Sequence, residues 1–272
     1  MGQWLRFEHD NRLEFGTLQD GVIRVFQGDM FAGPTATGRS VPLSDVRVRT
    51  PCDPSKMICL WNNFHELAAK LGSPAPDEPL YLLKAPSAFA AHGDTIHRPK
   101  SYAGKVVYEG ELGIVIGRRC RRVTRQDAAK VIAGYLVVND VTVRDWQFRV
   151  PTWTMGKSFD THGPTGPWIV TGDEIGDPHR LALRTWVNGD LRQSSNTKEL
   201  IFDCFALVEH LSTAFTLEPG DIISTGTPAG VGVGMNPPQL LKAGDIVRIE
   251  IEDIGEIENE VVEEPLEAAH IA

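Results

Sequence analysis

Apolar and polar residues alternate over the first fifty residues of the chain, in short runs separated by turn residues. Residues 12–18 and 22–26 follow this period of two, and Asp20-Gly21 lies between them. A period of two places alternate side chains on one face of a strand, and Asp-Gly is a typical hairpin turn. The pattern predicts a small N-terminal β-meander at residues 1–50, ended by the prolines of Pro51-Cys52-Asp53-Pro54.

The rest of the chain, residues 51–272, combines apolar runs of strand length with a few short helical patterns. The expected strands are residues 57–61, 79–84, 106–117 and 134–140, and the expected helices are 64–71, 128–132 and 202–215. The capping pattern Thr124-Arg125-Gln126-Asp127 precedes the second helix. Since strands do not alternate regularly with helices of about 10–15 residues, a doubly wound sheet is excluded. The pattern predicts a mainly β body with short helices, of the α+β class.

The composition narrows the classes of function. The chain has 272 residues, 42% of them hydrophobic and 23% charged, with a net charge of −9. This acidic balance argues against a nucleic-acid partner, because phosphate binding needs clustered Lys and Arg. No run approaches the roughly 18–20 apolar residues that cross a bilayer, and the N-terminal sequence has no apolar signal region. The four cysteines are scattered without a CxxC pair, so we expect reduced thiols in a cytoplasmic protein with no membrane partner.

Three carboxylates are the first candidates for chemistry. Glu109 and Glu111 are two residues apart in the expected strand 106–117, so both project from one face. Two buried like charges need compensation, and oxygen ligands favour Mg²⁺, Mn²⁺ or Ca²⁺ over zinc. Asp140 ends the next expected strand and could complete the ligand set. On spacing alone, a solvated sheet edge explains the two glutamates at least as well.

Basic and amide side chains further along are candidates for binding an anionic substrate. Lys157 lies in Gly156-Lys157-Ser158-Phe159-Asp160, and a lysine among apolar neighbours can have a lowered pKa or hold an anion. Arg144 and Gln147 follow Asp140, and an arginine fork can bind both oxygens of a carboxylate. The alternative is an ordinary surface lysine, with the other two residues on a solvated helix or loop.

A glycine-rich loop at residues 224–234 allows close backbone approach to a ligand, and Thr227 within it could donate a hydrogen bond to a carboxylate. The loop lacks the Lys-Ser/Thr end of a phosphate-binding loop, and a tight structural turn is the alternative. His65, beside Glu66, is the one histidine near these regions, although a lone histidine is more often structural. No GxSxG or HExxH motif is present, which excludes the common serine hydrolase and zinc protease patterns.

Several of these stretches together resemble the fumarylacetoacetate hydrolase family, in particular its bacterial 2-hydroxyhepta-2,4-diene-1,7-dioate isomerase and acylpyruvase-like members. The matching runs keep the family's order over roughly residues 51–262. They are Tyr108-Glu109-Gly110-Glu111-Leu112-Gly113, Asn139-Asp140-Val141-Thr142-Val143-Arg144-Asp145, Lys157-Ser158-Phe159-Asp160, Val187-Asn188-Gly189, Leu217-Glu218-Pro219-Gly220-Asp221 and Thr225-Gly226-Thr227-Pro228.

The resemblance implies a fold, a metal site and an assembly. The expected fold is a mixed β-sandwich roll behind a small N-terminal β domain, and the expected assembly is a homodimer. The expected cofactor is Mg²⁺ or Mn²⁺, with Ca²⁺ possible in crystals. The metal-binding positions would be Glu109, Glu111 and Asp140. The positions facing or near the substrate would be Lys157, Thr227, Arg144 and Gln147.

The activity that the resemblance implies is chemistry on a small oxo-acid through a metal-stabilised enolate. The leading expectation is hydrolysis of a C–C bond in a β-diketo or 2-oxo acid, a reaction of aromatic catabolism. One alternative is decarboxylation or tautomerisation of a 2-oxo or unsaturated dioic acid. The other is a catalytically silent protein that binds dicarboxylates.

One departure from the family pattern concerns the residues that activate water. The family often has Asn-Tyr-x-x-His-x-x-Glu, whereas here Asn63-Phe64 is followed by Leu67 and Lys70 in the His and Glu positions. The water-activating pair is then absent or displaced, which counts against hydrolysis. His65 could replace it as the catalytic base, but on a helix a shift of two residues turns a side chain by about 200°. We therefore expect a catalytic His65 only if this segment is not helical or is repositioned.

Overall fold

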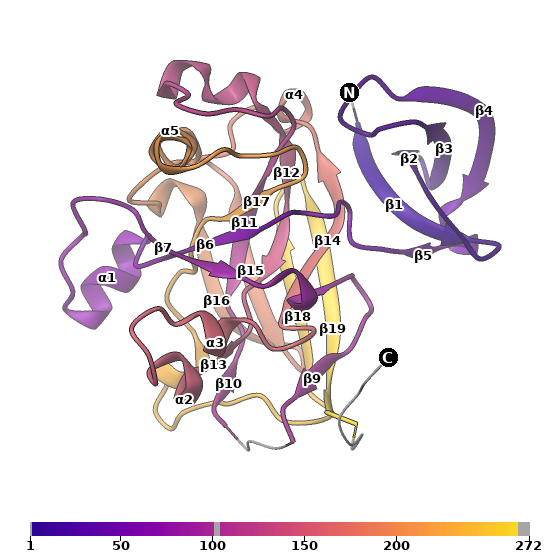
Figure 1. Ribbon diagram of the computed structural model, residues 1–272. Helices are drawn as coiled ribbons and strands as arrows, with labels where there is room; N and C mark the ends of the chain where they lie inside the picture. Colours follow the sequence, from indigo (N-terminus) through magenta and orange to yellow (C-terminus); the bar gives the residue numbers. More distant parts are fainter. Residues whose placement is uncertain (1, 101–103, 266–272) are drawn as a thin grey trace.

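The computed structural model describes residues 2–100 and 104–265 (Figure 1). The strands form two main β-sheets. The strands of the larger sheet are β1 (Gln3–His9), β2 (Arg12–Gln19), β3 (Val22–Gln27), β4 (Thr35–Pro42), β5 (Arg47–Val48), β6 (Met57–Trp61), β7 (Leu80–Lys84), β8 (Phe89–Ala90), β11 (Gly110–Ile116), β12 (Ile132–Asn139), β14 (Gly163–Val170) and β17 (Ile222–Ser224). Its order is β4-β3-β2-β1-β14-β12-β11-β17-β6-β7, with β5 beside β1 and β8 beside β14.

The smaller sheet packs against the centre of the larger one. Its strands are β9 (Ile96–Arg98), β15 (Ala182–Val187), β16 (Asp190–Asn196), β18 (Ile246–Ile251) and β19 (Gly255–Glu263), in the order β16-β15-β18-β19-β9. A separate pair joins β10 (Val106–Val107) to β13 (Thr142–Val143). Contacts between the sheets run from β11, β12 and β14 to β15, β18 and β19. Buried residues such as Ile114, Leu183 and Ile249 form a common core between them.

The helices are short and lie around the sheets (Figure 1). They are α1 (His65–Leu71), α2 (Arg144–Gln147), α3 (Thr154–Lys157), α4 (Gly172–Ile175) and α5 (Cys204–Ala214), with 3-10 turns at Leu43–Asp45, Pro86–Ala88, Arg125–Lys130, Thr197–Glu199 and Gly232–Gly234. Strand pairs are mostly antiparallel, but β17–β6, β14–β8 and β19–β9 are parallel. The predicted class, a mixed β-sandwich of the α+β type, is confirmed.

The N-terminal strands β1 to β5 lie to one side of the main body (Figure 1). The hairpin predicted at Asp20-Gly21 is present, since both residues have positive φ, 50° and 75°, between β2 and β3. These strands enclose a small core of their own, Leu5, Phe7, Ile23, Val25 and Val41. Strand β1 also pairs with β14 and so extends the larger sheet. The division into residues 1–50 and 51–272 stays a prediction, and its ends, residues 1 and 266–272, lie outside the described residues.

Two further expectations concern cysteines and membranes. Within the described residues the four cysteines are free, and three of them are buried. Burial raises the pKa of the Cys52 thiol to about 12. Across residues 2–100 and 104–265, no helix has the length and apolar character needed to cross a membrane.

Candidate active site

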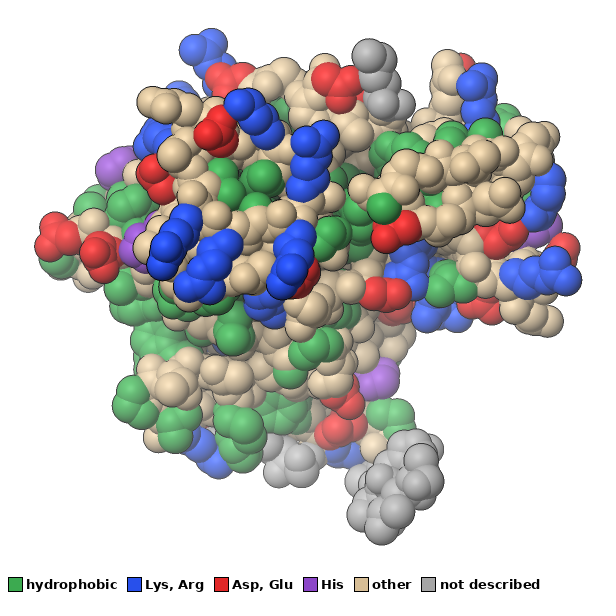
Figure 2. Space-filling model, turned by 45° about the horizontal axis from the view of Figure 1, so that its top comes forward, with side chains coloured by type: hydrophobic (Ala, Val, Ile, Leu, Met, Phe, Trp, Pro, Cys, Tyr) green, Lys and Arg blue, Asp and Glu red, His purple; other side chains and the backbone are tan. Residues whose placement is uncertain are grey.

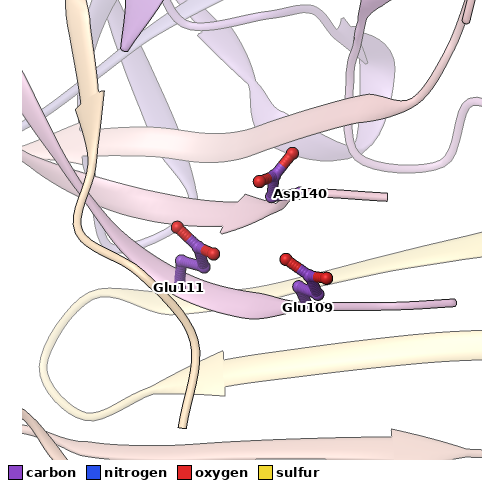
Figure 3. A group of neighbouring side chains, drawn as sticks. All are labelled: Glu109, Glu111 and Asp140. Atoms are coloured by element: carbon purple, nitrogen blue, oxygen red, sulfur yellow. The ribbon is translucent and has the colours of Figure 1, made fainter. Parts of the chain in front are cut away.

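Three carboxylates meet where β11 begins and β12 ends (Figure 3). Strands β11 and β12 are antiparallel neighbours, and their register places Gly110 opposite Asn139. Glu109 and Glu111 flank the first of these residues, and Asp140 follows the second. One carboxylate oxygen from each of the three acids lies within 4.8 Å of the others, and all three side chains are buried. The sheet register therefore brings together acids that are 31 residues apart in sequence, Glu109 and Asp140.

The expected single strand 106–117 is interrupted at the site. Tyr108 and Glu109 lie between β10 and β11, so Glu109 is not part of a regular strand. The backbone N–H of Glu109 donates to the side-chain oxygen of Asn139 at 3.1 Å, and the Asp140 N–H donates to the Glu109 carbonyl at 2.9 Å. The two glutamates lie close together, as expected. The two backbone hydrogen bonds of Glu109 also hold it beside Asp140.

Glu111 has one carboxylate oxygen that is bound and one that is free. Its Oε2 accepts from the Ser224 hydroxyl at 2.6 Å and from the Gly226 N–H at 2.8 Å. Gly226 has φ +93°, a conformation that L side chains rarely adopt, which explains glycine at this point of the loop. The Oε1 atom is buried without a hydrogen-bond partner. Burial, with repulsion from Asp140, raises the pKa of Glu111 well above its usual range.

Lys157 lies between two of the acids rather than among apolar side chains. Its Nζ is 2.6 Å from Glu109 Oε2 and 2.5 Å from Asp140 Oδ2, and the side chain is only 3% exposed. Burial alone would lower the pKa of Lys157, but the attraction of Asp140 and Glu109 outweighs it and the pKa is raised. Of the two possibilities for Lys157, a lowered pKa or binding of an anion, the first does not apply, because carboxylates lie beside the ammonium group.

Lys84, which the sequence analysis did not select, is a second buried lysine at the site. Its Nζ forms an ion pair with Asp140 Oδ1 at 2.9 Å and donates to the carbonyls of Val141, Lys157 and His162. The signal in the sequence was weak. Lys84 falls on the buried face of β7 with Leu82, but Tyr81 and Leu83 on the other face are also apolar, so no alternation marked it.

The charges at the site favour a bound divalent cation. With all three carboxylates ionised, the two ammonium groups leave one net negative charge in a buried place, and Glu111 Oε1 has no hydrogen-bond partner among the described residues. Carboxylate oxygens are the ligands that Mg²⁺, Mn²⁺ and Ca²⁺ prefer. The residues present therefore fit the expected ion, and Glu109, Glu111 and Asp140 are the side chains that would hold it.

A cavity of about 370 Å³ opens beside these groups. The residues that line it include Glu109 and Lys157 and also three of the candidates for substrate binding, Arg144, Gln147 and Thr227. Arg144 Nη1 donates to Gln147 Oε1 at 2.8 Å, and both residues belong to α2. Arg144 lines the cavity, so its guanidinium group can meet an anion there.

Thr227 lines the cavity, but its hydroxyl is engaged elsewhere. The Oγ1 atom donates to the Gly110 carbonyl at 3.0 Å and accepts from Gln193 Nε2 at 2.8 Å. The expected hydrogen bond from Thr227 to a substrate carboxylate is therefore not available in this arrangement. The hydroxyl instead ties the glycine-rich loop to the start of β11.

Helix α1 settles which of its side chains face the cavity. The segment is helical from His65 to Leu71, with Gly72 in the left-handed conformation at its end. Leu67 and Lys70 line the cavity, whereas His65 is exposed and is not part of the lining. The condition for a catalytic His65 is thus not met, because a helix turns it away from the position that Leu67 takes. The structure gives no support to His65 as a base.

The fold and the site define a class of protein, a β-sandwich with buried acids and lysines beside a substrate-sized cavity. The family described as fumarylacetoacetate (FAA) hydrolase, C-terminal, matches residues 56–262, and that described as Rv2993c-like, N-terminal, matches residues 3–51. The chain belongs to the fumarylacetoacetate hydrolase family. It is an enzyme of the hydrolase, decarboxylase or isomerase type, so the alternative of a silent binding protein is set aside.

Three similar proteins are named as a tautomerase, an isomerase and a hydrolase. The oxaloacetate tautomerase YisK of Bacillus subtilis is 42% identical over 223 residues, which are 80% of this chain and 74% of that protein. The structure of 2-hydroxyhepta-2,4-diene-1,7-dioate isomerase from Mycobacterium marinum has a TM-score of 0.86 at 38% identity and covers 97% of this chain and 99% of its own. Maleylpyruvate hydrolase from Sphingobium sp. SYK-6, solved with manganese(II) and pyruvate, has a TM-score of 0.78 at 31% identity and covers 96% and 99%.

Proposed function

We propose that this enzyme interconverts the keto and enol forms of a small 2-oxo acid and depends on Mg²⁺ or Mn²⁺. The observation that carries the proposal is the cavity wall formed by α1. That wall presents Leu67 and Lys70, an aliphatic side chain and an ammonium group, where hydrolysis would need a base that takes a proton from water. Tautomerisation needs no such base for water, because it only moves a proton between carbon and oxygen.

Each side chain at the site has a separate role in the proposed reaction. Arg144 and Gln147 would bind the substrate carboxylate on the cavity wall. A divalent ion held by the three carboxylates would act as a Lewis acid on the oxo group. Lys157 Nζ, 2.6 Å from Glu109 Oε2, would carry the proton: its N–H bond breaks as the enol carbon gains a C–H bond, and Nζ takes back the proton that the enol oxygen releases. The ammonium group would also stabilise the negative charge that develops on the substrate. Lys84 would hold Asp140 in place.

The names of similar proteins support this choice. The relative from Bacillus subtilis is named an oxaloacetate tautomerase, and the structure from Mycobacterium marinum is named an isomerase. The hydrolase from Sphingobium supports C–C bond hydrolysis as the second candidate, and its manganese supports a divalent ion here. A homodimer in the cytoplasm, as expected from the sequence, also belongs to this proposal.

The test is a tautomerase assay with oxaloacetate prepared in its enol form, which is followed by the loss of enol absorbance. We expect catalysis that EDTA abolishes and that Mg²⁺ or Mn²⁺ restores. Lys157→Met should lose at least about tenfold in kcat/KM, or about 1.4 kcal/mol, while the exposed Lys198→Met should not.

A parallel assay measures release of pyruvate from an acylpyruvate. Pyruvate release faster than tautomerisation would replace the proposal by C–C hydrolysis. An enzyme that keeps full activity in EDTA would contradict the metal requirement.

A further inference from the structure

The cavity has an apolar wall that the proposed chemistry on a 2-oxo acid does not use. Four of its polar groups, Glu109, Lys157, Arg144 and Gln147, belong to the oxo-acid end of the site. Much of the remaining lining is aliphatic or aromatic and comes from β6, α1, the α2–α3 segment and the loop of residues 230–234. A ligand that carried only carboxylates would leave this wall in contact with water.

Three aromatic rings form the centre of that wall. The ring centroids of Trp61 and Trp153 are 4.5 Å apart, and those of Phe148 and Trp153 are 5.8 Å apart in an edge-on arrangement. Trp61 and Phe148 are 37% and 61% exposed, although both residue types are usually buried in soluble proteins. Figure 2 shows hydrophobic side chains gathered at the lower left, on the side of the molecule that carries α1, α2 and α3. Aromatic side chains that line a cavity in this way are typical of apolar ligand recognition.

The backbone holds one of these rings under strain. Trp153 has φ 59°, a left-handed conformation that is an outlier for a bulky side chain. Strained residues of this kind cluster at ligand-binding sites. Trp153 is also the residue that precedes α3, which ends at Lys157. Trp153 and Lys157 therefore stand at the two ends of one short segment, so a group packed on the Trp153 ring contacts the segment that positions the Lys157 ammonium.

The aromatic wall is continuous with the anchor for the carboxylate. The guanidinium carbon of Arg144 lies 4.8 Å from the centroid of the Phe148 ring. A ligand whose carboxylate meets Arg144 would thus place the rest of its chain beside Phe148, Trp153 and Trp61. Lys70, also in the lining, is exposed, so its attraction for a second carboxylate is screened by solvent.

We propose that the preferred substrate is a 2-oxo acid that carries a planar apolar group, such as an aryl ring, beyond the carbon next to the oxo group. This inference rests on the proposed function and names the substrate class of the same site. The aryl ring would pack against the cavity side of the cluster formed by Trp61, Phe148 and Trp153, and the 2-oxo acid end would lie at Arg144 and Lys157.

The test compares turnover with binding, using the full-length enzyme with Mg²⁺. Tautomerisation of phenylpyruvate and of oxaloacetate is measured for the wild type, for Trp61→Ala and for Phe148→Ala. We expect the wild type to prefer phenylpyruvate. Each variant should lose about tenfold in kcat/KM for phenylpyruvate, or about 1.4 kcal/mol, and less than about twofold for oxaloacetate. Leu191→Ala, at an exposed apolar residue outside the cavity, is the control and should change neither.

Binding of inert analogues separates this inference from the proposed function. Phenyllactate and malate are titrated by calorimetry against the wild type and Trp61→Ala. Tight phenyllactate binding that is lost in Trp61→Ala supports the aromatic wall even if no tautomerisation occurs. Turnover of oxaloacetate with no binding of phenyllactate or phenylpyruvate overturns the inference and leaves the proposed function standing. A Trp61→Ala protein that changes its oligomeric state also overturns it, because the rings would then form a contact between copies of the chain.

Discussion

At the scale of single residues, the two oxygens of Asp140 explain much of the site. Oδ1 forms an ion pair with Lys84 at 2.9 Å, and Oδ2 forms one with Lys157 at 2.5 Å. Burial would raise the pKa of Asp140, but the two ammonium groups outweigh it and the pKa is lowered. Asp140 is thus kept ionised in the interior, whereas no ammonium group of the described residues forms an ion pair with Glu111.

This difference predicts the effect of Glu111→Gln. Two buried neighbouring acids repel the Glu111 carboxylate, so a neutral amide should leave the metal-free protein at least as stable as the wild type. The variant should lose the rise in Tm that Mg²⁺ gives the wild type, since ligand binding to the folded state is the source of that rise. Differential scanning fluorimetry with EDTA and with Mg²⁺ measures both effects, and the exposed Glu260→Gln serves as control. An undiminished Mg²⁺ effect in Glu111→Gln would remove Glu111 from the ligand set.

Lys84→Met should strongly destabilise the protein, although Lys84 is not among the residues that line the cavity. The change leaves Asp140 with one ammonium partner and removes the Lys84 donor from three carbonyls. Breaking a buried ion pair costs about 3–5 kcal/mol, so we expect a large loss in the free energy of unfolding together with weaker Mg²⁺ binding. Lys130→Met, at an exposed ion pair, should cost no more than about 1 kcal/mol. Urea unfolding of both variants provides the comparison, and equal losses would contradict the role of Lys84.

His162 makes stability depend on pH. Burial lowers its pKa to about 3, and its Nε2 lies 2.9 Å from the His97 carbonyl, which only accepts, so the neutral ring donates there. Between that value and the unfolded pKa of about 6.5, the unfolded chain binds a proton that the folded protein does not. The free energy of unfolding should therefore fall as the pH falls through this window, by up to about 1.4 kcal/mol per pH unit. His162→Gln should show a shallower fall in denaturant titrations across the same window, and identical slopes would refute this account.

At the scale of elements, local patterns predicted the regular parts and long-range pairing decided the rest. Helix α1 and its Gly72 end follow from the sequence, as do β6 and β7. The expected helix at residues 128–132 is instead a 3-10 turn over Arg125–Lys130, because Ile132 already pairs in β12. The capping pattern there is a bond between the Thr124 and Asp127 side chains, without a bond to the backbone.

The site was predictable as far as it depends on motifs, and not where it depends on packing. The acids at residues 109, 111 and 140 were selected from the sequence and lie together. Lys84 was missed, because its partner Asp140 is 56 residues away and only the packed sheet brings them together. The predicted environment of Lys157 was wrong for the same reason, because its apolar neighbours in sequence are not the neighbours of its ammonium group in space.

The close packing of α2 against α3 leads to a prediction for Gly156→Ala. A Cβ on Gly156 would lie 2.4 Å from the Gln147 backbone nitrogen, so α3 would have to move away from α2. Alanine normally stabilises a helix relative to glycine, but overpacking costs about 1–3 kcal/mol, and we expect the variant to be less stable and less active. Gly172→Ala is the matched control, since its Cβ would meet only a Tyr135 ring atom at 3.9 Å. Thermal unfolding and kcat/KM of both variants test this prediction. A fully active Gly156→Ala would show that the spacing of α2 and α3 is not critical for catalysis.

At the scale of the whole molecule, the proposed substrate is an anion, and it has to bind to an acidic chain. The net charge of −9 would repel a carboxylate at long range. The cavity counters this locally, because Arg144, Lys70 and Lys157 line it, whereas Glu109 is its one acidic lining residue within the described chain. Since exposed charges are screened over about 8 Å at physiological ionic strength, the local groups decide the binding.

The surface of the larger sheet leads to a prediction about the expected homodimer. Strand β7 ends the strand order of that sheet, and its Tyr81 and Leu83 are 39% and 44% exposed. An edge strand with exposed apolar side chains favours association with another chain. We therefore expect the homodimer to use this edge, and Leu83→Glu to convert it to a monomer at micromolar concentration, as measured by size-exclusion chromatography with light scattering. Leu13→Glu, at an equally apolar and 56% exposed residue of β2, should remain a dimer. A dimeric Leu83→Glu would place the interface elsewhere, and a monomeric wild type would show that the expected homodimer is wrong.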